Sequence, residues 1–343
     1  MDGYGDSAYR QTMRKIAPHV CLISEFYSSD GLVMSKFLAD SVLPHEKSED
    51  PLAIQIFGKN PEMFAKAAKI IEKEKYNISG IDVNMGCPAK KVVRSGHGSS
   101  LMINECMALN IITALDEATS LPISVKTRLS FDGGQDLIKF GKNLEKAGCK
   151  LLTVHGRTAK QAYTGTANLE PIYKLQEELN IPVVANGDIM NFKDGISKVK
   201  NLAGFMIGRG SFGNPWCFLG DKHNPENISD LEEKKLYSHL IPNNFVDGIY
   251  YPTLEEMLDT MDFHAKVLVE TKGEKKGSLE IRKHLVQYLK HFPGVKVYRK
   301  RLVTTDTYEN SKSIIQEIRE TFKEFLGRRP GLGEITKENL GME

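Results

Sequence analysis

Short apolar runs alternate with amphipathic stretches along the first 210 residues of the chain. Each amphipathic stretch has apolar residues at three- and four-residue spacing, as in PEMFAKAAKIIEKEK, and so predicts a helix. The runs are apolar throughout, which predicts strands of a parallel sheet covered on both faces. These runs occupy residues 20–26, 52–58, 79–85, 122–129, 150–157, 181–189 and 203–210.

Seven such strand–helix units in succession favour the α/β class, as a (β/α)8 TIM barrel, over a doubly wound sheet, in which the strand order changes along the chain. The first strand of such a barrel has no counterpart. The chain opens with MDGYGDSAYRQTMRKIA, a pattern typical of a loop that enters a helix. We expect either a start codon assigned too late, which we favour, or a barrel open at one seam with exposed strand edges.

The pattern changes after Pro215, where strands and helices stop alternating. Mixed charges, Pro and Asn follow, which predict a connector. The pattern is then helical only, and Thr253 and Thr307, with acidic residues close behind, predict helix starts. The sequence therefore predicts a barrel domain over residues 1–220, a connector over 221–252 and a small all-helical domain over 253–343.

Composition narrows the class of protein. The chain has 343 residues, of which 41% are apolar and 26% charged, as is usual for a soluble enzyme, and its net charge of +2 gives no global sign of a nucleic-acid partner. Its five cysteines include no CxxC pair, which argues against a disulfide framework or a structural zinc and predicts no metal. We find no membrane span and no signal peptide, and we expect a cytoplasmic protein.

Polar side chains stand at the ends of the apolar runs, where the loops of a barrel converge on its functional face. Such a ring at the mouth of an apolar barrel exceeds what the entry into a loop requires, and it predicts a binding site. Its members are Gln55, Asn84, Cys87, Lys126, Arg128, His155, Arg157, Asn186, Asp188, Gly208 and Arg209.

The last two strand ends, ANGDI and IGRGSFGNP, are rich in glycine. Backbone N–H groups at such positions can approach an anion, and barrels often bind a phosphate there. The letters GRGSFG also match GxGxxG, but no second strand–helix–strand unit with a ribose-binding acid follows, so we reject a dinucleotide fold. A phosphate held by this segment, with Arg209 nearby, is the better interpretation.

Lys126 and Cys87 decide between two kinds of chemistry. A lysine at the end of a central strand could form a Schiff base, or it could place a positive charge against the electron-rich edge of a flavin. Cys87 lies in a Gly-Cys-Pro turn, where neither a helix nor a strand interior can bury it. An aldolase has no use for this thiol, whereas a flavin reductase needs a proton donor, and a thiol of ordinary pKa, about 8.5, is protonated at neutral pH.

The motifs together resemble those of the tRNA-dihydrouridine synthases, bacterial type. The resemblance rests on MDGYGDSAYR, QIFG, IDVNMGCPAKKVVRSGHGSSLM, VKTRL, VHGRTAKQAYTG, VVANGDI, MIGRGSFGNPW and IRKHLVQYLKHFPG, in this order over nearly the whole chain. It implies a barrel that holds FMN, which NADPH reduces and which passes a hydride to C6 of a uracil in tRNA. It also implies that Cys87 is the general acid that protonates C5.

The same resemblance implies roles for the polar ring. Gln55, Lys126 and His155 would contact the flavin ring and ribityl chain, and Asn84 would contact the uracil, with Arg157 as a further substrate contact. Met1 matches the methionine of the family's Pro-Met pair, whose backbone meets the flavin, while the proline is absent here. The phosphate would be held by Asn186, Gly187, Asp188, Gly208 and Arg209.

A basic segment follows in the helical region. Residues 279–301 contain seven lysines and arginines against one acid, and part of this charge falls on one predicted helical face that could follow a phosphate backbone. A solvated helix surface is the alternative, and the uracil-reducing site on the same chain favours RNA contact. The residues predicted to bind tRNA are Arg282, Lys283, Lys290 and Arg299.

Two other functions stay open at this point. An FMN barrel reductase of a free small molecule, such as a dihydroorotate or dihydropyrimidine dehydrogenase, would have no reason for the basic segment. A tRNA-binding protein that has lost its chemistry would have no reason to keep Cys87, Lys126 and His155. The sequence does not indicate which uridine would be reduced, nor the oligomeric state.

Overall fold

The computed structural model describes residues 3–73, 78–290 and 292–341, which form two compact units. The first unit comprises Met1–Gly5, Cys21–Ile189 and Asp194–Gly208. The second comprises Asp6–Val20, Met190–Lys193 and Arg209–Glu343. No helix in these described ranges is both long and apolar enough to cross a membrane.

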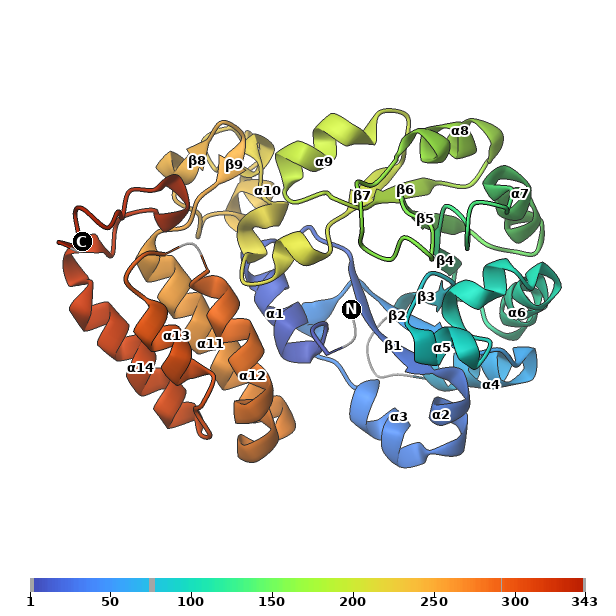
Figure 1. The fold of residues 1–343 in the computed structure, drawn as a ribbon, viewed down its shortest axis with the longest axis horizontal. Coiled ribbons are helices and arrows are strands. Elements are labelled where there is room, and N and C mark those ends of the chain that lie inside the picture. Colours follow the sequence, from blue (N-terminus) through green and yellow to red (C-terminus); the bar gives the residue numbers. More distant parts are fainter. Residues whose placement is uncertain (1–2, 74–77, 291, 342–343) are drawn as a thin grey trace. The chain divides into compact units, whose positions relative to one another are not determined.

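The first unit is built on one sheet of seven parallel strands that curls into a half-barrel (Figure 1). Each strand pairs with the next one in the chain, so the strands follow one another from β1 to β7 with no change of order. This order confirms the predicted barrel-type α/β fold. The strands are β1 (Leu22–Ser28), β2 (Leu52–Phe57), β3 (Ile78–Asn84), β4 (Ile123–Arg128), β5 (Leu151–His155), β6 (Val183–Asn186) and β7 (Gly204–Met206).

Helices follow the strands of this sheet, as the alternating pattern predicted. Helix α4 shows why they form: Pro61 stands at its first position and the side chain of Asn60 accepts a hydrogen bond from the Glu62 amide. Its buried residues, among them Phe64 and Ile71, recur on one face. The helices are α2 (Ser29–Met34), α3 (Lys36–Val42), α4 (Pro61–Ile71), α5 (Lys90–Arg94), α6 (Glu105–Ala118), α7 (Leu137–Lys146), α8 (Glu170–Glu178) and α9 (Phe192–Val199).

The second unit is mainly helical. Thr253 forms a capping box with Glu256, and Thr307 accepts a hydrogen bond from the Asn310 amide, so both predicted helix starts are confirmed. The range predicted as a connector contains a short helix and a two-stranded hairpin. The elements are α1 (Ser7–Ile16), α10 (Leu231–Leu236), β8 (Phe245–Val246), β9 (Ile249–Tyr250), α11 (Leu254–Lys272), α12 (Glu274–Tyr288), α13 (Lys296–Leu302) and α14 (Tyr308–Thr321).

The two units do not coincide with the ranges predicted from the sequence. Helix α1 and residues 209–220, predicted within the barrel domain, belong to the second unit. The reason is apolar burial, because Ala8, Ile16 and Trp216 lie in one hydrophobic core with residues of α11 and α12. The functional labels given to the predicted domains, FMN binding and tRNA binding, remain predictions.

Candidate active site at the carboxyl ends of the strands

Polar residues of neighbouring strands are brought together in the first unit. Asn84 is paired with Lys126 in the ladder between β3 and β4, and His155 is paired with Asn186 between β5 and β6. Gln55 on β2 is paired with Asp82 on β3. Parallel strands end at the same edge of a sheet, and this strand-end rule correctly grouped the predicted members among these side chains, which are Gln55, Asn84, Lys126, His155 and Asn186. Their roles are not tested by this placement.

The side chain of Lys126 on β4 reaches across β5 to β6. Its Nζ donates to Asn186 Oδ1 at 3.1 Å, although β5 lies between their strands. Removal from water lowers the pKa of Lys126 to about 8, while the Asp82 carboxylate works in the opposite direction. The site therefore contains a lysine whose charge is lost in mildly alkaline solution.

His155 is neutral at physiological pH. Burial lowers its pKa to about 3, and the positive charges of Lys126 and two arginines add to this effect. Its Nε2 lies 3.2 Å from Nη1 of Arg157. A guanidinium can only donate, so Nε2 accepts and the ring proton sits on Nδ1. No group in the described part of the chain accepts a hydrogen bond from this Nδ1, which leaves it as a donor for a ligand.

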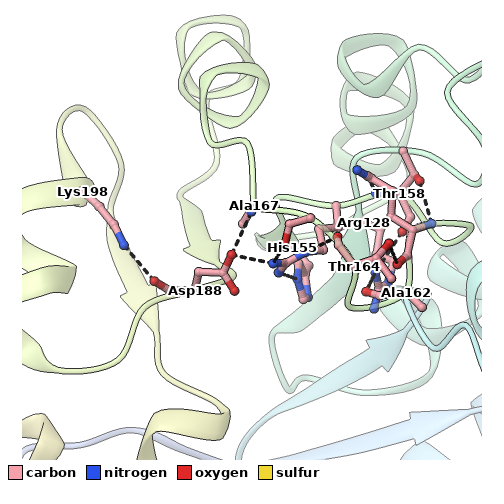
Figure 2. Close-up of polar contacts among 11 residues, drawn as sticks. Arg128, His155, Thr158, Ala162, Thr164, Ala167, Asp188 and Lys198 are labelled. Carbon is pink, nitrogen blue, oxygen red and sulfur yellow. Dashed lines mark hydrogen bonds and ion pairs between the residues drawn. The ribbon is translucent and has the colours of Figure 1, made fainter.

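Arg157, predicted as a substrate contact, is held by several groups of the protein itself. Its side chain is buried and makes four hydrogen bonds within the protein, to Thr164 O, Gly165 O, Asp188 Oδ2 and His155 Nε2. Figure 2 shows Asp188 also accepting from the Ala167 amide, at 2.9 Å, and bonded through its carbonyl to Lys198, at 2.8 Å. Arg157 thus anchors the loop between β5 and α8, and its contact with the substrate stays a prediction.

Arg128 fixes the same loop from the next strand. Its Nε donates to Gly86 O at 2.8 Å, and its Nη1 donates to Thr158 O and Ala162 O at 2.9 and 2.8 Å (Figure 2). The guanidinium also lies over the ring of Tyr163, 5.7 Å from the centroid. Arg128 therefore joins the segment just before Cys87 to the β5–α8 loop.

The glycines of the segment predicted to hold the phosphate differ in whether backbone conformation or close packing requires a glycine at the position. Gly187 has φ +118°, and a Cβ on it would lie 2.7 Å from the Ala167 side chain. Nothing lies within 4 Å of where a Cβ on Gly208 would be, so close packing does not require a glycine there. In the second unit, Gly210 and Gly213 are required by close packing against the backbones of Met190 and Gln287. Arg209, exposed, also belongs to the second unit.

Cys87 stands on a turn held by a side chain. Asn84 Oδ1 accepts from the amides of Gly86 and Cys87, at 3.2 and 3.0 Å. The Cys87 carbonyl accepts from the Ser99 amide at 3.1 Å, and a Cβ on Gly98 would lie 2.9 Å from that carbonyl oxygen. The thiol is free and half-buried. The Gly-Cys-Pro segment therefore presents a reduced cysteine on a rigid turn at the end of β3.

The predicted tRNA-binding residues lie in the second unit and do not form one helical face. Helix α12 ends at Tyr288, so Lys290 lies beyond it. Arg282 Nε donates to the Thr305 carbonyl, and Nε of Arg299 is buried, so these two arginines serve packing in part. Lys283 is half-buried. The exposed lysines of this segment are Lys290, Lys296 and Lys300.

Asp82 is the site residue that sequence reasoning missed. It is fully buried on β3, where both carboxylate oxygens accept hydrogen bonds, from Ser124 and Gln55. The available signal was a carboxylate inside the apolar run SGIDVNM. Met1, predicted to meet the flavin, lies outside the described residues.

A curled parallel sheet with lysine, histidine, amide and thiol groups at its carboxyl edge defines a barrel-type enzyme. Residues 1–325 match the dihydrouridine synthase family, and the chain belongs to that family. A "Probable tRNA-dihydrouridine synthase 1" of Synechocystis sp. is 32% identical over 94% of this chain and 86% of the relative. "tRNA-dihydrouridine synthase B" of Pseudomonas aeruginosa is 31% identical over 89% of this chain and 88% of its own length.

Proposed function

We propose that this protein is an FMN- and NADPH-dependent reductase that converts a uridine of tRNA to 5,6-dihydrouridine. Membership of the dihydrouridine synthase family supports the reaction class, and the relatives' printed names support tRNA as the substrate. The observation that carries the assignment to this site is the Cys87 turn, because Asn84 both fixes that turn and pairs with Lys126 in the sheet.

The donors at the mouth of the half-barrel fit a flavin mononucleotide. Lys126 offers a positive charge for the electron-rich edge of the ring, and the neutral His155 offers Nδ1–H. Nothing crowds the side of Gly208 on which a Cβ would lie, and we propose that a phosphate approaches from there. In this proposal Asn186, Gly187 and Asp188 contribute to the phosphate site through amide and backbone groups, because Arg157 and the Ala167 amide already engage the Asp188 carboxylate. The role predicted for Arg209, which belongs to the second unit, stays a prediction.

Reduced FMN, when bound, would supply the hydride that adds to C6 of the uracil. The protein would supply the proton for C5 from Sγ of Cys87, and Asn84 would orient both the cysteine turn and the base. Proton transfer from a positioned acid contributes a factor of about 10² to 10⁴ in rate. Proton donation would leave Cys87 as a thiolate, and a proton from solvent would restore the thiol after each turnover.

The proposed RNA partner requires contacts away from the reacting base. A uridine in folded tRNA has to leave its stack to reach a site of this kind, and phosphate contacts elsewhere can offset that cost. We assign these contacts to the exposed lysines of the basic segment in the second unit, Lys290, Lys296 and Lys300. A cytoplasmic location, where tRNA is found, follows from the same proposal.

The test is to purify the protein and identify the released chromophore, then to measure dihydrouridine in unmodified tRNA after incubation with NADPH. We expect a yellow protein that releases FMN on heating and forms dihydrouridine. A yellow protein that reduces free pyrimidines but not tRNA would establish the small-molecule reductase instead. A colourless protein that binds tRNA and cannot be loaded with FMN would establish a binding protein without this chemistry.

A further inference from the structure

A line of side-chain hydrogen bonds runs from β4 to the Cys87 turn within the first unit. Ser124 Oγ donates to Asp82 Oδ1 at 2.6 Å, and Gln55 Nε2 donates to Asp82 Oδ2 at 2.7 Å. Asn84 Nδ2 donates to Gln55 Oε1 at 2.9 Å. Asn84 Oδ1 then accepts from the backbone amides of Gly86 and Cys87. Asp82 is thus connected to the backbone of Cys87 through the side-chain amides of Gln55 and Asn84.

The orientation of the two amides in this line is set from its Asp82 end. A primary amide can face a neighbour with either its oxygen or its nitrogen, but a carboxylate oxygen only accepts. If Gln55 were turned over, its oxygen would face the carboxylate and its nitrogen would face the nitrogen of Asn84. Asn84 would then have to turn as well and would present donors to two backbone donors.

Either protonation state of Asp82 preserves this orientation. Burial raises the pKa of Asp82, against the hydrogen bonds from Ser124 and Gln55 and the charge of Lys126. A proton taken up by the carboxyl group can sit on Oδ1, where the hydroxyl oxygen of Ser124 can accept it. Oδ2 continues to accept from Gln55. The orientation of the amides therefore depends on an acceptor at Oδ2 and not on the negative charge.

We propose that Asp82 is a positioning residue, which, through Gln55 and Asn84, holds the Cys87 turn in the arrangement that the reaction needs. The side chain of Asp82 bonds to Ser124 and Gln55, and its effect reaches Cys87 through two hydrogen-bonded amides. The catalytic part of this inference rests on the proposed function, whereas the structural part, the rigidity of the turn, does not.

The structural part is tested by hydrogen–deuterium exchange of the peptide that contains Gly86 and Cys87. Asn84→Ala, which removes the acceptor itself, gives the reference for a released turn. We expect Asp82→Ala to accelerate exchange of these amides about tenfold, approaching that reference. Asp82→Asn keeps an acceptor toward Gln55 and can donate to Ser124, so it should exchange like the wild type. Ser124→Ala is the matched control, because it removes a neighbour of Asp82 but not the Oδ2 bond.

The catalytic part is tested by kcat and KM for tRNA. Asp82→Ala should lower kcat about ten- to hundredfold with little change in KM, since misplacement of a reacting group by a small distance has an effect of this size. Asp82→Asn should restore most of the loss.

Wild-type exchange and wild-type kcat in Asp82→Ala would overturn the inference. Asp82→Asn as impaired as Asp82→Ala in both measurements would also overturn it, in favour of a role for the charge. Wild-type protein that forms no dihydrouridine would refute the proposed function, and the exchange comparison would still test the positioning. If Asp82→Ala fails to fold, Asp82→Asn in an otherwise identical preparation still separates acceptor from charge.

Discussion

At the scale of single residues, the proposed proton donor is Cys87. Its turn is fixed by Asn84 and Ser99, and its thiol is half-buried and free. We predict that Cys87→Ala still binds FMN and oxidises NADPH but loses roughly a hundredfold or more in the rate of dihydrouridine formation. Cys21→Ala is the control, because Cys21 is exposed and unrelated to this turn. Equal rates of dihydrouridine formation in the wild type and Cys87→Ala would show that another group supplies the proton.

Lys126 predicts a pH dependence of flavin binding. Its pKa, about 8, lies well below the ordinary value for lysine, because removal from water penalises the charged form. The ammonium ion therefore predominates below about pH 8 and is lost above it. We predict that the dissociation constant for FMN rises between pH 7 and 9 in the wild type. Lys126→Arg, whose guanidinium stays charged, should remove this dependence even if it binds more weakly. A flat profile in the wild type would show that the charge does not contribute.

The strand-end rule found Asn84, Cys87, Lys126 and His155 because it depends only on the period of the sheet and the direction of the chain. It could not show that Arg157 bonds to loop carbonyls, since a guanidinium at a strand end reaches far enough to bind either a ligand or a loop carbonyl. Asp82 was missed for a related reason. A carboxylate inside an apolar run gives no sign of its partners, which come from β2 and β4.

At the scale of elements, the exposed lysines after α12 and on α13 give a sharper test of RNA binding than the four residues first predicted. Arg282 and Arg299 are partly engaged in packing, so replacing them would also disturb the fold. We predict that the triple replacement of Lys290, Lys296 and Lys300 by Ala flattens the slope of log affinity for tRNA against log salt by up to about three units.

The matched control for this triple variant is the replacement of Lys139, Lys146 and Lys174 by Ala. These lysines are exposed on α7 and α8 of the first unit, and their removal changes the net charge equally. FMN content and NADPH oxidation should stay near wild type in both variants. Identical salt slopes for the two triple variants, measured by fluorescence anisotropy at several salt concentrations, would exclude a specific role for the basic segment.

All seven strands were predictable from the sequence because each is a largely apolar run that adjoins amphipathic stretches. The sequence did not predict that α1 belongs to the second unit. Its pattern predicts a helix with one apolar face, but nothing local indicates that this face packs with Trp216 and α11. The end of α12 at Tyr288 was also hidden, since the basic residues continue past it at a spacing that still suits a helix.

At the scale of the whole molecule, buried histidines link stability to pH. His264 and His284 lie in the core of the second unit, with ring centroids 4.6 Å apart, and His264 Nδ1 lies 3.1 Å from the Tyr288 hydroxyl. Burial lowers the pKa of both histidines, that of His264 to about 4. The charged and titratable groups that act on this pair are Asp6, Tyr9, Lys272, Lys283 and Tyr288.

The sign of the effect follows from the difference between the folded and unfolded pKa. In the unfolded chain, the histidine has a pKa of about 6.5 and takes up a proton as the pH falls below that value. In the folded protein, His264 takes up its proton only near pH 4. The free energy of unfolding therefore does not depend on these histidines above about pH 6.5. It decreases as the pH falls toward 4, by up to about 1.4 kcal/mol per pH unit for each such histidine. The ion pair of Asp6 with Lys272 depends on the Asp6 carboxylate, whose pKa is lowered, and so persists to more acid pH.

We predict that the urea midpoint falls between pH 7 and 5, and that His264→Gln reduces this fall because glutamine does not titrate but can still accept from Tyr288. His239→Gln, at an exposed position, is the control and should leave the pH dependence unchanged. Trp216 is the only tryptophan and lies in the core of the second unit, so its fluorescence reports that unit, while far-ultraviolet circular dichroism reports the whole chain. Coincident midpoints from the two probes would mean that acid weakens the molecule as one cooperative system. An earlier fluorescence transition would confine the effect to the second unit, and identical pH slopes for His264→Gln and the wild type would contradict the role of His264.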